Sequence, residues 1–599
     1  MKKTDSKSGI SILFGISFIS PITYSILAYE MDVVQRVFFF ATSLLLFLVY
    51  VVKIKYEKEI QLNKLLFILI IIFPFTFLTC FFNGSSSLLI LQLSDLTIPI
   101  SILLLSALML VILGEERFFK VLSYSVVIIS TIFSIIGVLE VFQIKVLQLP
   151  TIIPPGSTLG HRSFASEYLL PSLPFLLLLK EYLPKDNRKL LFIAGVINIS
   201  FLLFTRNRAG IIILFVSIII YILFILLNRE KGNRLKSLTP VLGVLLISLS
   251  ISFIPVKGTE RPDLETTAST LFDSDFKSNQ LRIKFWEASI EMIKEKPFTG
   301  VGFLNWSGNY PKYNGEYFND ENATHIHSIH SHNDFLELFA ENGIAAGLTF
   351  LLIYISIAIL LLKRIKINEQ YFPLLLTFLI TFAFSLVAFP NHKFASFFLS
   401  SVVAGTVLID SPERKRKSFS LKFTYLKWAL LILICIGGIT SYIKLKSELL
   451  FGESIYLKER GQYPLMYERL EKISVIFYPY DTSKQPVDYY KGIANSYLGR
   501  YSEALQNNLH GQELAPFNPI LMRNIASSYY SMKKLSKAIN QLEKVKNYFP
   551  NYLTPQISLL ELYSENRESE KEKSLFLELI NKFPNNPKLI PYKKKFNFE

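Results

Sequence analysis

The stretch GIIILFVSIIIYILFILL, residues 210–227, contains eighteen consecutive residues without a charged side chain. A helix rises about 1.5 Å per residue, so a run of this length nearly crosses the roughly 30 Å hydrocarbon core of a bilayer. Twelve further apolar runs of similar length lie near 9–28, 36–53, 64–82, 90–113, 121–140, 164–183, 189–205, 238–255, 343–363, 372–389, 394–410 and 425–443. The sequence therefore predicts an all-α, polytopic membrane protein with about 12–13 transmembrane helices.

The composition agrees with this fold class. Hydrophobic residues make up 51% of the 599 residues, charged residues make up 18%, and the mean hydropathy is +0.37. A soluble chain of this length would divide into several domains with more polar surface. The two cysteines, Cys80 and Cys435, lie inside apolar runs, so they do not supply a disulfide framework.

The net charge of +16 could indicate nucleic-acid binding, but the positions of the basic residues indicate membrane topology instead. No small-residue cleavage site follows the N-terminal tail, so we expect the first apolar run to be retained rather than removed as a signal peptide. By the positive-inside rule, the N-terminus is cytoplasmic, and thirteen crossings place the C-terminus outside. The basic segments occur in alternate loops, at 2–7, 53–64, 180–189, 228–236, 363–366 and 414–417.

Two domains are expected from the change in composition near residue 446. The first is a membrane domain over 1–445, whose long outer loop covers about 256–342, and the second is an extracytoplasmic helical domain over 446–599. A period of 34 residues aligns Ala504 with Ala538, and Pro516 with Pro550. Small residues where helices cross and a proline at a helix end resemble tetratricopeptide repeats, which form α-solenoids and bind protein segments. An ordinary α-helical domain is the alternative.

Four of the seven histidines gather in HIHSIHSHND, residues 325–334, at the end of the long outer loop. A proton-transfer site, a metal site and a solvated loop all fit this pattern. Zn²⁺ accepts imidazole ligands, but a ligand set on one strand without nearby cysteine is weak as a closed site, so we predict no metal site. We interpret His325 and His327 as solvated, and His330 as a group that supports His332 or the substrate.

Five segments, in this order along the chain, resemble the O-antigen ligase and polymerase superfamily. They are GSTLGHRSFASEYL (156–169), TRNRAG (205–210), QLRIKFWEASIEMIKEKPFTGVGFLNW (280–306), HNDFLELFAENGIAAG (332–347) and FPNHKFASFFLSSVVAGTVL (389–408). The sequence departs from the family pattern where His161 and Arg162 replace Asn-Pro, where Asn207 replaces Ser, and where Ala209 replaces Gly. The resemblance covers most of residues 1–445.

This resemblance implies a GT-C-like glycosyltransferase on the outer face of the bacterial cytoplasmic (inner) membrane. Its donor is a glycan on a polyprenyl pyrophosphate, expected to be undecaprenyl pyrophosphate. The resemblance assigns pyrophosphate binding to Arg208 and Arg282, and it makes His332 the catalytic base or the group that positions the acceptor. It further implies inverting transfer without a metal or another cofactor.

Elementary chemistry agrees with these roles. Guanidinium groups match phosphate oxygens and keep their charge, and Arg282 lies on a predicted amphipathic helix over about 278–295 that is closed by Pro297. An imidazole suits proton removal from an acceptor hydroxyl near neutral pH. Snorkelling is the alternative interpretation of both arginines.

Further polar residues near the outer surface are candidate substrate contacts: Asn333, His161, Arg162, Glu167 and Lys393. Helix capping, interfacial snorkelling or topology explains His161, Arg162, Glu167 and Lys393 equally well.

The acceptor stays open. A lipid A core sugar would make the protein a ligase in lipopolysaccharide biosynthesis, which we favour. A growing lipid-linked glycan would make it an O-antigen or exopolysaccharide polymerase, and a Ser or Thr hydroxyl would make it a protein O-oligosaccharyltransferase. A polysaccharide transporter and an assembly scaffold that uses the repeats are non-enzymatic alternatives. Membrane lipids and a protein bound by the repeats are expected partners, and nucleic acid is not.

Overall fold

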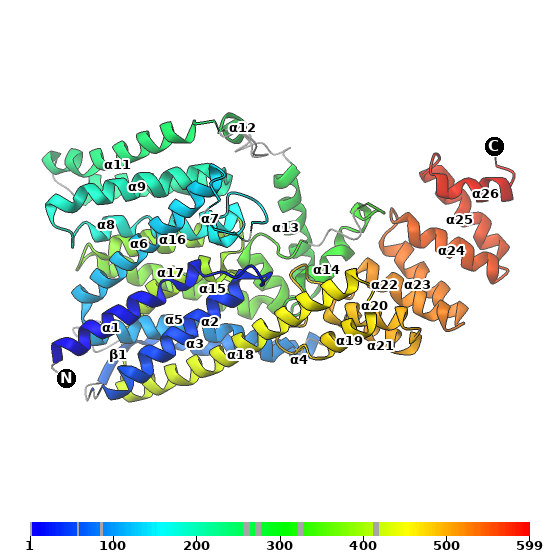
Figure 1. Ribbon diagram of the computed structural model, residues 1–599, viewed down its shortest axis with the longest axis horizontal. Coiled ribbons are helices and arrows are strands. Elements are labelled where there is room, and N and C mark those ends of the chain that lie inside the picture. Colours follow the sequence, from blue (N-terminus) through cyan, green and yellow to red (C-terminus); the bar gives the residue numbers. More distant parts are fainter. Residues whose placement is uncertain are drawn as a thin grey trace.

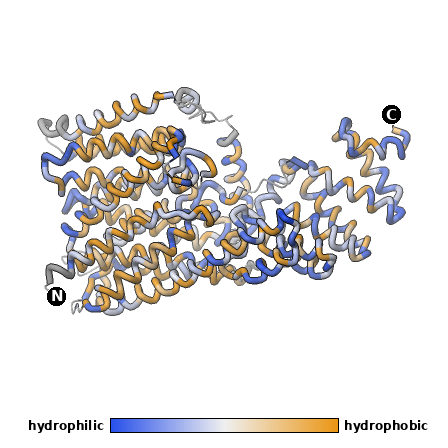
Figure 2. The backbone as a smooth tube through the Cα atoms, in the orientation of Figure 1, coloured by the Kyte–Doolittle hydropathy of each residue, from blue (hydrophilic) through white to orange (hydrophobic). Residues whose placement is uncertain are grey.

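The helices form a bundle and an arm that projects from one end of it, as seen in a computed structural model of the chain (Figure 1). The N-terminus lies at the free end of the bundle and the C-terminus at the tip of the arm (Figure 1). Hydrophobic residues predominate along the helices of the bundle, whereas the arm has a larger share of hydrophilic residues (Figure 2). The structure describes residues 3–54, 56, 59–83, 88–145, 147–149, 151–228, 231–255, 264–269, 277–321, 328–410 and 418–598.

Seven helices of the described chain are long and apolar enough to cross a membrane. They are α2 (Met31–Val49), α5 (Leu89–Leu113), α6 (Glu115–Val141), α9 (Arg188–Phe204), α10 (Arg208–Asn228), α15 (Asp334–Ile365) and α18 (Phe423–Glu459). Five shorter apolar segments lie in or near α1 (Lys3–Ser17), α3 (Lys64–Phe75), α11 (Lys231–Ser252), α16 (Tyr371–Ser385) and α17 (Phe394–Leu408). The predicted all-α polytopic fold is confirmed.

The remaining apolar run, 164–183, differs from the single span that we predicted. It forms two short helices, α7 (Arg162–Ser172) and α8 (Phe175–Leu179). Pro174 separates them, because its nitrogen cannot donate the hydrogen bond that a continuing helix needs and its ring clashes with the preceding turn. The break leaves α7 packed inside the bundle beside α16 and α17.

The centre of the bundle is the contact between α5 and α17. Ser106 donates its hydroxyl to the carbonyl of Val402 at 2.8 Å, across the two helices. Gly405 allows the close approach, since a Cβ atom there would lie 2.4 Å from the carbonyl oxygen of Leu103. Small residues at such crossings are typical of membrane helices, where close backbone packing replaces the hydrophobic driving force.

A two-stranded antiparallel sheet closes the N-terminal end of the bundle. Strands β1 (Glu59–Asn63) and β2 (Ser418–Lys422) pair Leu62 with Phe419. Arg364, near the end of α15, donates to the carbonyl of Ile409 at 2.5 Å, and Ile409 in turn bridges to Leu62. Several basic loops therefore meet at this end, opposite the arm.

Three short helices belong to the predicted outer loop: α12 (Leu264–Ser269), α13 (Lys277–Glu295) and α14 (Trp306–Tyr313). Helix α13 runs across the end of the bundle that faces the arm (Figure 1) and coincides with the predicted amphipathic helix. It is anchored by Trp306, whose indole nitrogen donates to the hydroxyl of Ser289 at 2.8 Å. The short helix α4 (Cys80–Asn83) follows α3.

The arm continues directly from α18, which is 37 residues long and runs past the expected domain boundary at 445–446. The helices that follow are α19 (Tyr463–Glu471), α20 (Val487–Tyr497), α21 (Tyr501–Leu514), α22 (Pro519–Ser531), α23 (Leu535–Tyr548), α24 (Leu553–Glu565), α25 (Ser569–Lys582) and α26 (Ile590–Lys595). Helices α21, α23 and α25 begin at intervals of 34 residues, the predicted period.

Candidate active site

A cavity of about 670 Å³ opens at the end of the bundle that faces the arm. Its wall combines the loop before α2, the start of α7, the turn before α10, helix α13, the loop before α15 and the turn between α16 and α17. Six residues that we selected from the sequence line it: His161, Glu167, Arg282, His330, His332 and Lys393. Residues from distant segments of the chain thus meet in one space.

His332 is held by aromatic side chains. Its ring stacks on Phe285 of α13, with centroids 5.8 Å apart and planes 13° apart, and meets the edge of Phe389 at 5.0 Å. The backbone of His332 has a φ of 56°, a left-handed conformation that is costly for a residue with a Cβ atom and is found at many functional sites.

The next residue, Asn333, positions His332 by capping α15. Its side-chain oxygen accepts hydrogen bonds from the backbone N–H groups of Phe335 (3.1 Å) and Leu336 (3.0 Å), and its amide donates to the carbonyl of Leu386 at 3.1 Å. An N-cap of this kind fixes where the helix starts and therefore where the preceding side chain lies. Asn333 is accounted for by this capping role.

The imidazole of His332 stays neutral near neutral pH. Burial, together with the nearby charge of Arg282, lowers the pKa of His332 to about 4. A neutral imidazole has a nitrogen lone pair that accepts a proton, so His332 is in the state that a general base requires.

Arg282 lines the cavity with this histidine, whereas Arg208 is not among the residues of the cavity wall. Burial and the charge of Arg208 lower the pKa of Arg282, and the charge of Glu167 opposes them. Arg208 begins α10, and its neighbours Asn207 and Ala209 form part of the cavity wall. Two neighbouring arginines form a strong electrostatic site for phosphate oxygens.

Arg206, two residues before Arg208, has a structural task. Its guanidinium donates to the carbonyls of Leu203 at 3.2 Å and Ser252 at 2.7 Å, which ties the end of α9 to the end of α11. Arg206 therefore has a structural role, whereas Arg208 lies between two residues of the cavity wall, Asn207 and Ala209.

The start of α7 carries two residues that we selected from the sequence, His161 and Arg162. His161 caps the helix, since its Nδ1 accepts from the N–H of Ser163 at 3.1 Å, and it also lines the cavity. Burial, with the charges of Arg162 and Lys393, lowers the pKa of His161 to about 4. Arg162 is the first residue of α7 and lies outside the cavity wall.

Lys393 contributes a cation to the cavity and lies over the ring of Phe164 at 5.0 Å. Glu167, one turn along α7, is 2% exposed and accepts a hydrogen bond from the hydroxyl of Ser396 at 3.2 Å. Both side chains face the same space, so the cavity holds an acidic group as well as cations.

Glu30 also lines the cavity, from the short loop before α2, and was not predicted from the sequence. Burial alone would raise the pKa of Glu30, but Lys444, Lys393 and Lys484 outweigh it and lower the pKa to about 2. In the sequence, the two acidic residues Glu30 and Asp32, close together between two apolar runs, were the feature that could have indicated this contribution.

The arm also reaches this site. Thr482, in the loop between α19 and α20, lines the cavity, and Lys484 follows two residues later. The loop is held by Asp481, whose carboxylate accepts from the N–H groups of Ser483 and Gln485, both at 2.8 Å. Tyr480 fastens it to the membrane domain by donating to Asn305 at 3.1 Å. No sequence pattern indicated this contribution.

A second, largely apolar cavity of about 370 Å³ adjoins the first. Glu30, His330, Lys393 and Thr482 line both spaces, so the two cavities share part of their walls. The second cavity extends between helices of the bundle, where its wall holds apolar side chains and a few charged ones. The apolar ones include Ile70, Phe73, Phe77, Leu96, Ile98 and Ile353, and the charged ones include Arg36, Asp95 and Lys444.

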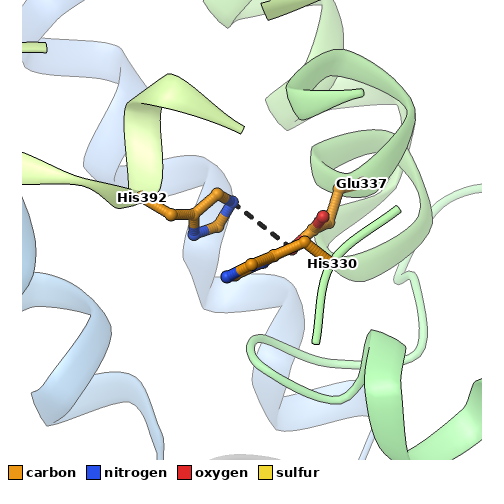
Figure 3. A group of neighbouring side chains, drawn as sticks. All are labelled: His330, Glu337 and His392. Atoms are coloured by element: carbon orange, nitrogen blue, oxygen red, sulfur yellow. Dashed lines mark hydrogen bonds and ion pairs between the residues drawn. The ribbon is translucent and has the colours of Figure 1, made fainter. Parts of the chain in front are cut away.

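One group of side chains fits a metal ion: His330, Glu337 and His392, whose ligand atoms all lie within 4.8 Å of one another (Figure 3). From the sequence, we considered only the histidines of residues 325–332 as metal ligands. Of those, His325 and His327 lie outside the described residues, and His332 packs against Phe285 rather than joining the group.

Residues 193–351 match the model of the O-antigen ligase family. The matched segment contains Arg208, Arg282 and His332. It supports the resemblance to the O-antigen ligase superfamily and a role in membrane glycan transfer.

Similarity to other known proteins is weak. No curated protein matches the chain. A solved structure described as "Functional Characterization of Pseudomonas Aeruginosa pilF" is 13% identical, and the alignment covers 40% of this chain and 96% of that one. Its TM-score of 0.21 is too low to indicate a shared fold.

Proposed function

We propose that this protein transfers a glycan from a polyprenyl pyrophosphate, undecaprenyl pyrophosphate in bacteria, to an acceptor hydroxyl, in the manner of an O-antigen ligase. The observation that supports the proposal is a pair of adjoining cavities with a shared wall. One holds Arg282, Lys393 and His332, and the other is largely apolar and extends between bundle helices. A lipid-linked pyrophosphate has the same two parts, a charged head group and an apolar chain.

In the proposed reaction, the acceptor oxygen attacks the anomeric carbon while the bond from that carbon to the pyrophosphate oxygen breaks. His332 takes the proton of the acceptor hydroxyl. Arg208 and Arg282 stabilise the negative charge that grows on the leaving polyprenyl pyrophosphate. A single displacement inverts the anomeric configuration, and these steps need neither a covalent enzyme intermediate nor a metal ion.

Donor binding would also adjust the base. The charge of Arg282 lowers the pKa of His332, and a bound pyrophosphate would offset that charge. The pKa of His332 would then rise towards neutrality, where a base both remains unprotonated and accepts a proton readily. Donor binding would thereby make His332 a more effective base.

The proposed orientation places the cavity on the outer face of the bacterial cytoplasmic membrane and the N-terminus inside. His332 precedes the start of α15, whereas Lys363 and Arg364 lie in its last turn. The positive-inside rule assigns that basic end to the cytoplasm. The arm, on the side of His332, would then be extracytoplasmic and could bind an acceptor or a partner protein.

A reconstitution tests the function. The purified full-length protein receives a defined undecaprenyl-pyrophosphate glycan and one acceptor at a time: lipid A core, a lipid-linked glycan, or a protein with Ser and Thr hydroxyls. His332→Ala and Arg282→Ala are each expected to lower the rate at least about 100-fold, because each removes a group that acts in the transition state.

His510→Ala is the control. It removes a histidine that lies in the arm, where it pairs with the carboxylate of Asp488 at 2.6 Å. Transfer to lipid A core would support the ligase, and transfer to another acceptor would replace it by a polymerase or a protein glycosyltransferase. Unchanged transfer in His332→Ala would refute the catalytic assignment.

A further inference from the structure

Three ligand-type side chains converge from three segments of the chain (Figure 3). His330 lies in the loop before α15, Glu337 in the first turn of α15, and His392 at the end of the 3₁₀ turn η8 (Pro390–His392). Glu337 Oε1 lies 2.7 Å from His330 Nδ1 and 3.3 Å from His392 Nε2. The two rings lie 4.1 Å apart, centroid to centroid.

The group is shielded from water. The side chains of His330 and Glu337 are 8% and 3% exposed, and that of His392 is 24% exposed. The neutral imidazole is the form that binds metal ions, and burial favours that form.

A second carboxylate beside the group has an oxygen without a partner. Asp334 is 3% exposed, and its Oδ2 accepts from the backbone N–H of Asn391 at 3.2 Å and from its side-chain amide at 2.6 Å. Its Oδ1 is buried and accepts no hydrogen bond from the described residues. That oxygen lies 3.7 Å from His392 Nε2. Asp334 Oδ1 is therefore a buried oxygen that is free to act as a ligand atom beside the group.

Two lysines lie near the group. Lys393 and Lys484 are near enough to lower the pKa of both imidazoles. Within the described residues, however, neither lysine forms an ion pair with Asp334 or Glu337.

We propose that His330, Glu337 and His392 bind a divalent transition-metal ion of the Zn²⁺ type, with Asp334 Oδ1 as a fourth ligand or as its neutralising neighbour. Two imidazoles and a carboxylate are a donor set that Zn²⁺ accepts. Ligands about 2.0–2.1 Å from a tetrahedral ion lie about 3.3–3.4 Å apart, so the group needs shifts below 1 Å to close around it.

The ion would act as a clamp next to the catalytic histidine. It would join the loop that carries His332 to α15 and to η8. Phe389, directly before η8, contacts the rings of both His330 and His332, with centroids 4.5 and 5.0 Å apart. Fixing His330 and His392 would therefore fix one wall against which His332 packs. The ion has no part in the transfer step.

Direct metal binding tests this proposal. The full-length protein in detergent is stripped with chelator and dialysed, and Zn²⁺ is titrated against a competing chromophoric chelator, with metal content measured by mass spectrometry. We expect one ion per chain in the wild type. His392→Ala and Glu337→Gln are each expected to weaken Zn²⁺ affinity at least about tenfold, since each removes a ligand.

Two control variants make the test specific. His510→Ala keeps all three ligands and is expected to bind like the wild type. The double variant His325→Ala/His327→Ala is also expected to bind normally, and loss of binding there would assign the ion to the histidine-rich loop instead. Equal affinity in the wild type and Glu337→Gln, or no binding in the wild type, would overturn the proposal.

Thermal unfolding separates lost ligands from lost folding. At the same Zn²⁺ concentration, Zn²⁺ should raise the Tm of the wild type by mass action and raise that of folded His392→Ala less. If His392→Ala does not fold, Glu337→Gln supplies the same comparison, and an equal rise in Tm there counts against the site. Because the readout is binding, a failure of glycan transfer would refute the proposed function without touching this result.

Discussion

At the scale of single residues, His332 combines a strained backbone with a suppressed charge. Its left-handed φ is held by the capping of Asn333 and by two aromatic contacts, so the position is determined by its surroundings rather than by its own preference. Burial and the charge of Arg282 keep the ring neutral. Position and protonation state therefore come from different neighbours, and the two effects can be separated by substitution.

The pH dependence of transfer should report this coupling. The active form of His332 is neutral, so the kcat/KM of the wild type should fall only as the pH drops towards about 4, the pKa of the free enzyme. Arg282→Gln removes a repelling charge, so the pKa of His332 rises and the acid limb moves to higher pH. The limb should stay below the ordinary value of 6.5, because burial persists.

Lys294→Gln is the control, since Lys294 lies on the same helix but is exposed and paired with Glu291 at 2.8 Å. Its acid limb should coincide with that of the wild type. An acid limb that stays in place in Arg282→Gln would mean that another group titrates.

At the scale of elements, the contact between α5 and α17 depends on the absence of a side chain at Gly405. Gly405→Ala would place a methyl group 2.4 Å from the carbonyl oxygen of Leu103, and a backbone oxygen cannot move aside cheaply. We expect a loss of about 1–3 kcal/mol, seen as a lower Tm in detergent.

Gly438→Ala is a matched comparison, because it is also a helical glycine in an apolar helix. Its new Cβ atom would meet Phe40 at 3.5 Å, an ordinary contact. The higher helix propensity of alanine should make this variant neutral or slightly stabilised. Equal Tm values for the two variants would show that α5 and α17 do not pack this closely.

At the scale of the whole molecule, the arm contributes to the site itself. Lys484 lines the second cavity together with Glu30 and Lys393, although it lies in the loop between α19 and α20. Burial lowers the pKa of Lys484, and the charges of Glu30 and Glu341 act in the opposite direction. Both effects agree with a buried lysine beside these carboxylates. In the proposed function, the arm would thus act in donor binding and not solely as a surface for partners.

Lys484→Gln should raise the KM for the donor about tenfold, which corresponds to the loss of about 1.4 kcal/mol of attraction to the pyrophosphate. Lys533→Gln provides the control, because Lys533 has the same left-handed backbone (φ of 62° against 60°) but is exposed within the repeats. Steady-state kinetics on both variants decides the matter, and equal KM values would confine the arm to a structural or partner-binding role.

Features that depend on neighbouring residues were predictable from the sequence. Apolar runs become helices because a bilayer leaves no partner for backbone N–H and C=O groups except the helix itself. Helix α13 and the 34-residue period of the arm follow from local periodicity. His332, Arg282 and His161 were candidates because their residue types suit the chemistry and their loops lie on one side of the membrane.

Contacts between distant segments were decided only by the tertiary structure. The pairing of β1 with β2, the entry of Lys484 into the site and the meeting of His330 and Glu337 with His392 join residues dozens to hundreds of positions apart. Hydropathy and residue spacing do not predict which distant segments contact each other, because many arrangements of apolar helices satisfy the same local pattern. The sequence by itself determined which segments are apolar helices, because that property depends on neighbouring residues, whereas the packing of those helices decided which side chains share the cavity.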